Sequence, residues 1–277
     1  MLRQRAIPIR LKKHRRWRAL IVFIFCCLLL PQIKGQDNFC KVTDSLGVRT
    51  YFIKATQAMQ QGKYEEAIAF FQKSGDLYQE IGCQGKVFLM NRNILRTYIR
   101  TRNLVGFNTF FYKTIKKISA PKTKEEFIYK GRLYLLKSEM CVLSNEIDTA
   151  AVFAQRAKQI HEKKGAWKYY IRDNVQLAKI ALRQQDYEGM ERFLDNSFSA
   201  YKSYIRVDNR LLQQIMGLYG ALYYKTGNYE EALEKTINAA EVVQKDMKTQ
   251  EDTLYLARFY NNIGLFYIEL GDIYKAE

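Results

Sequence analysis

Residues 216–240 read MGLYGALYYKTGNYEEALEKTINAA, and this stretch decides the fold because it predicts two helices joined by a tight turn. Apolar and small residues from Met216 to Tyr223 follow the three-then-four spacing of one helical face. Gly227 can adopt the left-handed conformation that ends a helix. Ala232 and Ala239 then supply small residues for close packing of a second helix. The stretch therefore predicts a helical hairpin.

The same pattern recurs along the chain. Residues 61–68, QGKYEEAI, repeat the turn and the start of the second helix, and residues 260–276, YNNIGLFYIELGDIYKA, repeat the first helix and the turn. A single hairpin cannot bury its own apolar face, so a near-constant period predicts stacked units. The residues that begin each second helix are 40, 43, 40, 42 and 44 positions apart: Tyr64, Leu104, Ile147, Tyr187, Tyr229 and Ile273.

These residues resemble the tetratricopeptide repeat family, in which a small residue, an aromatic three further on, a Gly-x-aromatic turn and two alanines recur. The resemblance covers roughly residues 45–277 and implies an all-α, right-handed solenoid of about six antiparallel helix pairs. The period exceeds the usual ~34 residues, which implies longer helices, similar to the sensory region of bacterial membrane-bound regulators. The residues expected to pack the repeats are Ala55, Gly62, Tyr64, Ala67, Ala150, Ala157, Tyr187, Gly220, Tyr223, Gly227, Tyr229, Ala232, Ala239, Gly264, Tyr267 and Gly271.

Two copies depart from this pattern. Phe107 and Met190 stand where the first alanine of the second helix is expected in the second and fourth units. The sixth unit stops at Glu277, one residue after Ala276, so we expect the last hairpin to be truncated. The resemblance implies that a natural continuation holds further repeats, a membrane helix and an output domain.

Residues 1–35 are typical of an export signal. Eight Arg and Lys residues precede the apolar run ALIVFIFCCLLL at 19–30, which Pro31 closes. A membrane span needs about 20 residues, so this shorter run favours the core of a signal peptide, with an uncleaved anchor as the alternative. Residues 36–44 would form a short leader. The basic flank predicts that the following part is exported, periplasmic or associated with the inner membrane.

The basic charge of the chain is concentrated in residues 1–35. The formal net charge is +17, with 45 Lys and Arg. Nine of these lie in residues 1–35, which hold no acidic residue, so the remainder carries 36 basic and 28 acidic residues, a net +8. A positive remainder can attract acidic peptides, anionic lipid headgroups or polyanions. Membrane contact is expected through an uncleaved amino-terminal segment or a missing carboxyl-terminal part.

The sequence shows no catalytic constellation. Beyond the signal region, His161 is the single histidine, among charged residues, and we expect it to be solvated. No paired histidines, Cys-x-x-Cys, phosphate-binding glycine loop or Gly-x-Ser-x-Gly turn occurs, so we expect no metal, no cofactor and no enzyme activity.

Two further features concern structure. The pair Thr123 and Glu126 predicts a capping box at the start of a helix. Cys141 falls at a position of the repeat where we expect a small buried residue.

Two cysteines are candidates for a disulfide. Cys40 precedes the first helix and Cys83 lies near the end of the second, and antiparallel helices bring those ends together. An exported chain permits oxidation. The hypothesis is a Cys40–Cys83 disulfide that closes the first hairpin, and the alternative is two unrelated thiols.

The sharpest functional signal is a run of basic residues at four-residue steps, Arg92, Arg96 and Arg100. In the family that the chain resembles, first helices line a concave groove that holds peptides. Such a basic groove suits an acidic extended peptide or a chain-terminal carboxylate, whereas the alternative is a solvated helix face. The residues that register places in the groove, with Arg100, are Arg92, Arg96, Arg132, Glu139, Lys179, Arg183, Tyr224, Lys225 and Asn261.

The sequence therefore predicts a non-catalytic protein- or peptide-binding repeat domain, exported in a bacterium, as the sensory or scaffold part of a larger signalling regulator. One alternative is a free-standing periplasmic assembly scaffold, which would be a homodimer. Another is a cytoplasmic basic regulator that binds a protein or nucleic acid, although nucleic acid is not the expected partner of these residues.

Overall fold

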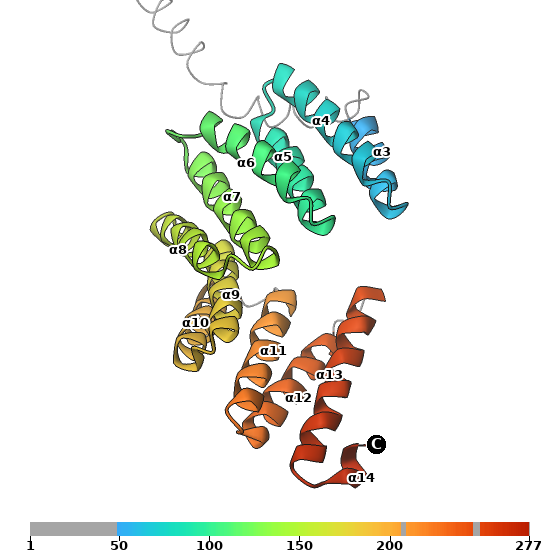
Figure 1. The fold of residues 1–277 in the computed structure, drawn as a ribbon, viewed down its shortest axis with the longest axis vertical. Helices are drawn as coiled ribbons and strands as arrows, with labels where there is room; N and C mark the ends of the chain where they lie inside the picture. The colour runs from blue at the N-terminus through green and yellow to red at the C-terminus, as the bar shows by residue number, and fades with distance from the viewer. Residues whose placement is uncertain (1–48, 206–208, 246–249, 277) are drawn as a thin grey trace, which may run out of the picture. The chain divides into compact units, whose positions relative to one another are not determined.

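The computed structural model describes residues 49–205, 209–245 and 250–276, and these residues form helices and no strand (Figure 1). By its internal contacts the chain divides into two compact units, residues 1–91 and 92–277. The predicted signal, the leader and Cys40 lie outside the described residues. The boundaries of the predicted domains therefore stay predictions.

Successive helices pair as hairpins. In the first unit, α3 (Arg49–Gln60) packs against α4 (Tyr64–Glu80), and α5 (Gln84–Arg100) contains the division between the units. The second unit continues with α6 (Leu104–Lys117), α7 (Lys124–Leu143), α8 (Ile147–Lys163), α9 (Trp167–Gln184), α10 (Tyr187–Ala200), the π-helical turn η2 (Tyr201–Ile205), α11 (Asn209–Lys225), α12 (Tyr229–Lys245), α13 (Gln250–Glu269) and α14 (Ile273–Ala276). The six residues that the period singles out are the first residues of α4, α6, α8, α10, α12 and α14, as predicted.

The turns inside the hairpins share one backbone geometry. The N–H that follows the left-handed residue donates to a carbonyl five residues earlier, from Asn228 to Tyr223 at 2.7 Å and from Asp186 to Ala181 at 2.9 Å. This bond closes a Schellman motif, which ends the first helix sharply. The left-handed residue, two positions before each second helix, is Gly62 (φ 75°), Arg102 (54°), Asn145 (62°), Gln185 (60°), Gly227 (76°) or Gly271 (79°).

Small residues let the two helices of a hairpin approach each other. A side chain at Gly220 of α11 would collide with the Thr236 hydroxyl of α12, so the pair depends on glycine there. Phe107 and Met190, which replace an alanine in two of the hairpins, are also fully buried. The predicted alanines have no exposed surface: Ala55, Ala67, Ala150, Ala157, Ala232 and Ala239.

The predicted aromatic residues lie at the edge of this packing rather than at its centre. Each of them is half-buried: Tyr64, Tyr187, Tyr223, Tyr229 and Tyr267. The last predicted glycine of a first helix, Gly264, is also half-buried. Cys141 is fully buried, as expected. The capping box at α7 is confirmed, because the Thr123 hydroxyl accepts from the Glu126 N–H at 3.2 Å while the Glu126 carboxylate accepts from the Thr123 N–H at 3.3 Å.

First helices of neighbouring hairpins contact one another in the second unit. α7 contacts α9, and α9 contacts α11, while α8 and α10 each pack against the first helix that follows them. Side chains of α7, α9 and α11 can therefore converge on one side of this unit. Among the described residues, no helix has both the length and the apolar character needed to cross a membrane.

Candidate functional site: an arginine pocket

A cavity of about 360 Å³ opens among the first helices of the second unit. Its charged lining comes from α5, α7 and α9, and Gln214 of α11 contributes at one edge. We call it the arginine pocket and define it by the residues Arg92, Arg96, Arg132, Glu139, Tyr169, Arg172, Gln176 and Lys179.

Helical spacing explains why these side chains meet. Arg92 and Arg96 are four residues apart on α5, so they lie on one face of that helix. The two polar residues that α7 contributes to the pocket, Arg132 and Glu139, are seven apart, which is two helical turns. The same interval separates the pairs Arg172 and Lys179, and Tyr169 and Gln176, on α9. Each helix thus turns one polar stripe toward the cavity.

The pocket is strongly positive. It holds four arginines and one lysine but a single carboxylate, Glu139. Burial, together with the neighbouring charges of Arg132, Arg96 and Arg172, lowers the pKa of Arg92 to about 10. Burial is also the main cause that lowers the pKa of Arg132. Burial raises the pKa of Glu139, although the nearby cations Arg96, Lys179 and Arg172 act in the opposite direction.

The guanidinium groups keep donors available for a ligand. Within the described part of the chain, the five cations form no ion pair with a carboxylate. Arg92 donates from Nη2 to the Asn93 amide oxygen at 3.3 Å, and its buried Nε has no hydrogen-bond partner. Arg132 rests on an aromatic ring, with Cζ 5.0 Å from the centroid of Tyr169. Such a set of forked donors matches the oxygens of carboxylate or phosphate groups.

The prediction that His161 is solvated is wrong. Its side chain is fully buried, and Nδ1 lies 2.5 Å from Oδ2 of Asp173, which is also fully buried. The other ring nitrogen, Nε2, lies 3.1 Å from the carbonyl oxygen of Ile128. The charged neighbours in sequence suggested solvent, but the partners of His161 come from two other helices.

Five predicted groove residues line the arginine pocket together: Arg92, Arg96, Arg132, Glu139 and Lys179.

The other predicted groove residues lie elsewhere. Arg100 is exposed at the end of α5, and Arg183 donates to the Val142 carbonyl at 3.5 Å. The Tyr224 hydroxyl donates to the Glu269 carboxylate at 3.3 Å. Lys225 and Asn261 are exposed.

Seven residues that line the cavity were missed from the sequence: the polar Tyr169, Arg172, Gln176 and Gln214, and the apolar Leu135, Leu136 and Val175. The sequence does carry a signal for Arg172 on α9, because it precedes Lys179 by two helical turns and so lies on the same face of the helix.

Cys83 is buried and belongs to a disulfide. Its predicted partner, Cys40, lies outside the described residues, so the Cys40–Cys83 pairing stays a prediction.

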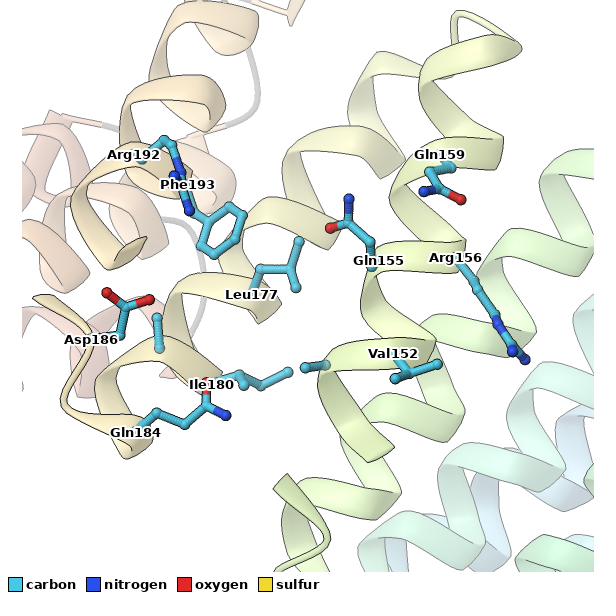
Figure 2. A pocket seen from close by; sticks show the side chains of 12 residues that line it. Val152, Gln155, Arg156, Gln159, Leu177, Ile180, Gln184, Asp186, Arg192 and Phe193 are labelled. Atoms are coloured by element: carbon cyan, nitrogen blue, oxygen red, sulfur yellow. The ribbon is translucent and has the colours of Figure 1, made fainter. Parts of the chain in front are cut away.

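A second cavity, of about 570 Å³, lies between α8, α9 and α10 (Figure 2). Leu177 and Ile180 of α9 form part of its apolar lining, and Phe193 of α10 points toward Leu177. Gln155 and Arg192 lie among its polar residues, whereas Arg156 extends away from Phe193. Half of its twelve lining side chains are apolar, and it lacks the cluster of cations seen in the arginine pocket.

Comparison with known families finds a match for the first and the last of the described hairpins. The tetratricopeptide repeat model matches residues 48–80 and 257–277. The chain carries tetratricopeptide repeats. The first match covers α3 and α4, and the second covers most of α13 together with α14. No curated protein sequence matches the chain.

Solved structures share the fold of these repeats. BtubC from P. vanneervenii has a TM-score of 0.58 and 15% identity, over 84% of this chain and 86% of that one. The apo form of RapI has a TM-score of 0.61 and 14% identity, over 88% and 67% of the two chains. TTC0263, a thermophilic tetratricopeptide repeat protein of Thermus thermophilus, has a TM-score of 0.50 and 13% identity, over 76% and 98%. At these identities the likeness concerns the fold alone.

Proposed function

We propose that this tetratricopeptide repeat chain binds an acidic extended peptide, or a chain-terminal carboxylate, through the arginine pocket and without catalysing a reaction. The observation that supports this most is the charge of the pocket, in which five cations surround one carboxylate without forming an ion pair among the described residues. A ligand that brings carboxylates would relieve the repulsion between these cations.

The local chemistry supports binding rather than catalysis. Arginine side chains recognise carboxylates through paired N–H donors and do not readily exchange protons. The described residues hold no group of three or more His, Cys, Asp and Glu side chains that could bind a metal ion. The one carboxylate of the pocket, Glu139, is surrounded by cations, so it would repel a carboxylate ligand less than its charge suggests.

The test is a charge reversal on α5. A fluorescein-labelled, glutamate-rich decapeptide with a free carboxyl terminus is titrated with the protein, and its anisotropy gives the dissociation constant. Arg92→Glu combined with Arg96→Glu should weaken binding by about tenfold or more, because two attractive contacts become repulsive. The same peptide with an amidated terminus separates recognition of side chains from recognition of the terminal carboxylate.

A matched control separates local contact from overall charge. Lys113→Glu combined with Lys117→Glu makes the same change in net charge at two exposed positions of α6, a second helix. This variant should keep the affinity of the wild type within about twofold, apart from a small effect of net charge. Equal affinities for the wild type and the α5 variant, at unchanged helicity, would refute the proposed function.

We also propose that the chain is exported and serves as a sensory or scaffold part of a larger regulator. Support comes from the basic and apolar run in residues 1–35, which lies outside the described residues. A reporter that is active only outside the cytoplasm, fused after Gly35 and after Glu277, should be active in both fusions. An inactive reporter in both would favour the alternative of a cytoplasmic regulator.

A further inference from the structure

His161 lies where three helices of the second unit meet. It belongs to α8, its Nδ1 lies 2.5 Å from the Asp173 carboxylate of α9, and its Nε2 lies 3.1 Å from the Ile128 carbonyl of α7. Both ring nitrogens are therefore engaged, and the ring has no freedom to rotate without breaking a buried hydrogen bond. The packing is also tight, because a side chain at Gly131 of α7 would come within 2.5 Å of Nε2.

The imidazole connects to the arginine pocket through one aromatic ring. The centroids of the His161 and Tyr169 rings are 5.2 Å apart, with 30° between their planes. The Tyr169 ring in turn lies 5.0 Å from the Cζ atom of Arg132. Tyr169 and Arg132 both line the pocket, whereas His161 does not. A continuous set of contacts thus runs from a buried histidine to a guanidinium that faces the cavity.

Arg132 depends on this contact for its position. Its guanidinium forms no ion pair with a described carboxylate, and Arg92, Arg96 and Arg172 repel it. A long side chain among like charges would otherwise turn away from them, since an arginine side chain has several rotamers of similar energy. The face of Tyr169 offers a favourable cation–π contact that keeps the guanidinium in the pocket.

We propose that His161 is a positioning residue for ligand binding: it holds the Tyr169 ring, and the ring holds the Arg132 guanidinium ready for an acidic ligand. The inference rests on the proposed function of the arginine pocket, but it concerns a residue that does not line that pocket. Ile128 and Asp173 complete the arrangement, because they fix the orientation of the imidazole from both sides.

The first test measures affinity in a double-mutant cycle with the glutamate-rich decapeptide. In His161→Asn the shorter amide still reaches toward Asp173, but no ring remains to pack against Tyr169. The loss should be about tenfold in the wild-type background, the size of one cation–π contact. In an Arg132→Met background the same substitution should cost less than about twofold, because the group that it positions is gone.

Two variants of Tyr169 keep the inference testable should His161→Asn fold poorly. Tyr169→Leu removes the ring and should reproduce the loss of affinity. Tyr169→Phe retains the ring and should bind like the wild type. Equal losses in both arginine backgrounds, full affinity in Tyr169→Leu, or full affinity in a folded His161→Asn would each overturn the inference.

The second test needs no ligand. The Arg132 Nε–H resonance of the wild type should be displaced by the ring current of Tyr169, and His161→Asn should move it toward the value of an exposed arginine. Gln159→Ala, an exposed change on the same helix α8, is the control and should leave it in place. An Arg132 resonance that does not respond to His161→Asn would refute the positioning role. A wild type that binds no acidic peptide would refute only the proposed function, provided that the resonance still shifts.

Discussion

Replacing Gly227 by alanine should destabilise the fifth hairpin through its backbone alone. The residue has φ 76°, and a methyl group added there would meet no atom within 4 Å. The left-handed conformation costs an L-residue roughly 1–2 kcal/mol, and the alanine regains part of this by restricting the unfolded chain. The free energy of unfolding should therefore fall by about 1 kcal/mol.

The reciprocal change should act in the opposite direction. Gln185 occupies the equivalent turn of the fourth hairpin with φ 60° and ψ 22°, and it is exposed. Gln185→Gly should stabilise the protein by several tenths of a kcal/mol up to about 1 kcal/mol, because it removes the left-handed strain but makes the unfolded chain more flexible. The two variants separate a backbone effect from a loss of side-chain contacts.

Urea denaturation followed by circular dichroism at 222 nm measures both effects. Gly85→Ala is the control: Gly85 also has open space around it, but it belongs to the first turn of α5 and not to a turn between helices. There alanine should stabilise the helix by about 0.5 kcal/mol. The reasoning would be refuted by a Gly227→Ala variant as stable as the wild type, or by Gly85→Ala and Gly227→Ala changing stability in the same direction.

Three further predictions concern the His161–Asp173 pair and a disulfide. His161→Ala should lower the free energy of unfolding by about 3 kcal/mol or more, because it leaves Asp173 buried without its partner. Urea denaturation measures this loss, and a loss below about 1 kcal/mol would contradict the expected contribution of the pair to stability. Burial raises the pKa of Asp173 to about 6 in the folded protein, whereas it is about 3.9 in the unfolded chain. Protonation of this carboxyl therefore stabilises the folded state. This stabilisation is complete below about pH 3.9 and is lost as the pH rises through about 6. The stability of the wild type relative to Asp173→Asn should therefore increase as the pH falls from about 6 to 4, and a difference independent of pH would argue against it. Mass spectrometry of oxidised protein, alkylated with and without prior reduction, should yield a Cys40–Cys83 peptide, which two alkylated thiols in the unreduced sample would rule out.

The spacing of hairpins could be predicted from sequence, although half of the turns carry no glycine. Gly62, Gly227 and Gly271 mark three turns by residue type. Arg102 and Gln185 adopt the same left-handed geometry, but their residue types do not mark a turn. The backbone hydrogen bonds and the packing of the two helices impose the geometry there. Their position was still predicted, since a repeat period constrains turns that residue type alone does not reveal.

The arginine pocket could be predicted in part. Helical register brought Arg92, Arg132 and Lys179 to the correct face, because it depends only on spacing within each helix. Register does not show how far along the helices a cavity extends, and for this reason it also predicts Tyr224 and Asn261, which lie outside the pocket.

The burial of His161 could not be predicted from its neighbours in sequence. The side chains next to it, Glu162 and Lys163, are charged and exposed, which is typical of a solvated helix end. Its hydrogen-bond partners are Asp173 on α9 and the carbonyl of Ile128 on α7, 33 residues away. Such a site depends on the packing of three helices, so no local pattern indicates it.

Photo-crosslinking tests most directly whether the arginine pocket holds the ligand. The glutamate-rich decapeptide carries a benzophenone group at its centre, is irradiated in complex with the full chain, and the crosslinked residues are mapped by mass spectrometry. Crosslinks should fall on α5, α7 and α9, and 0.5 M salt should abolish them because it screens charge contacts. Crosslinks on α6, α8 or α10 instead, or crosslinks insensitive to salt, would contradict the proposed binding site.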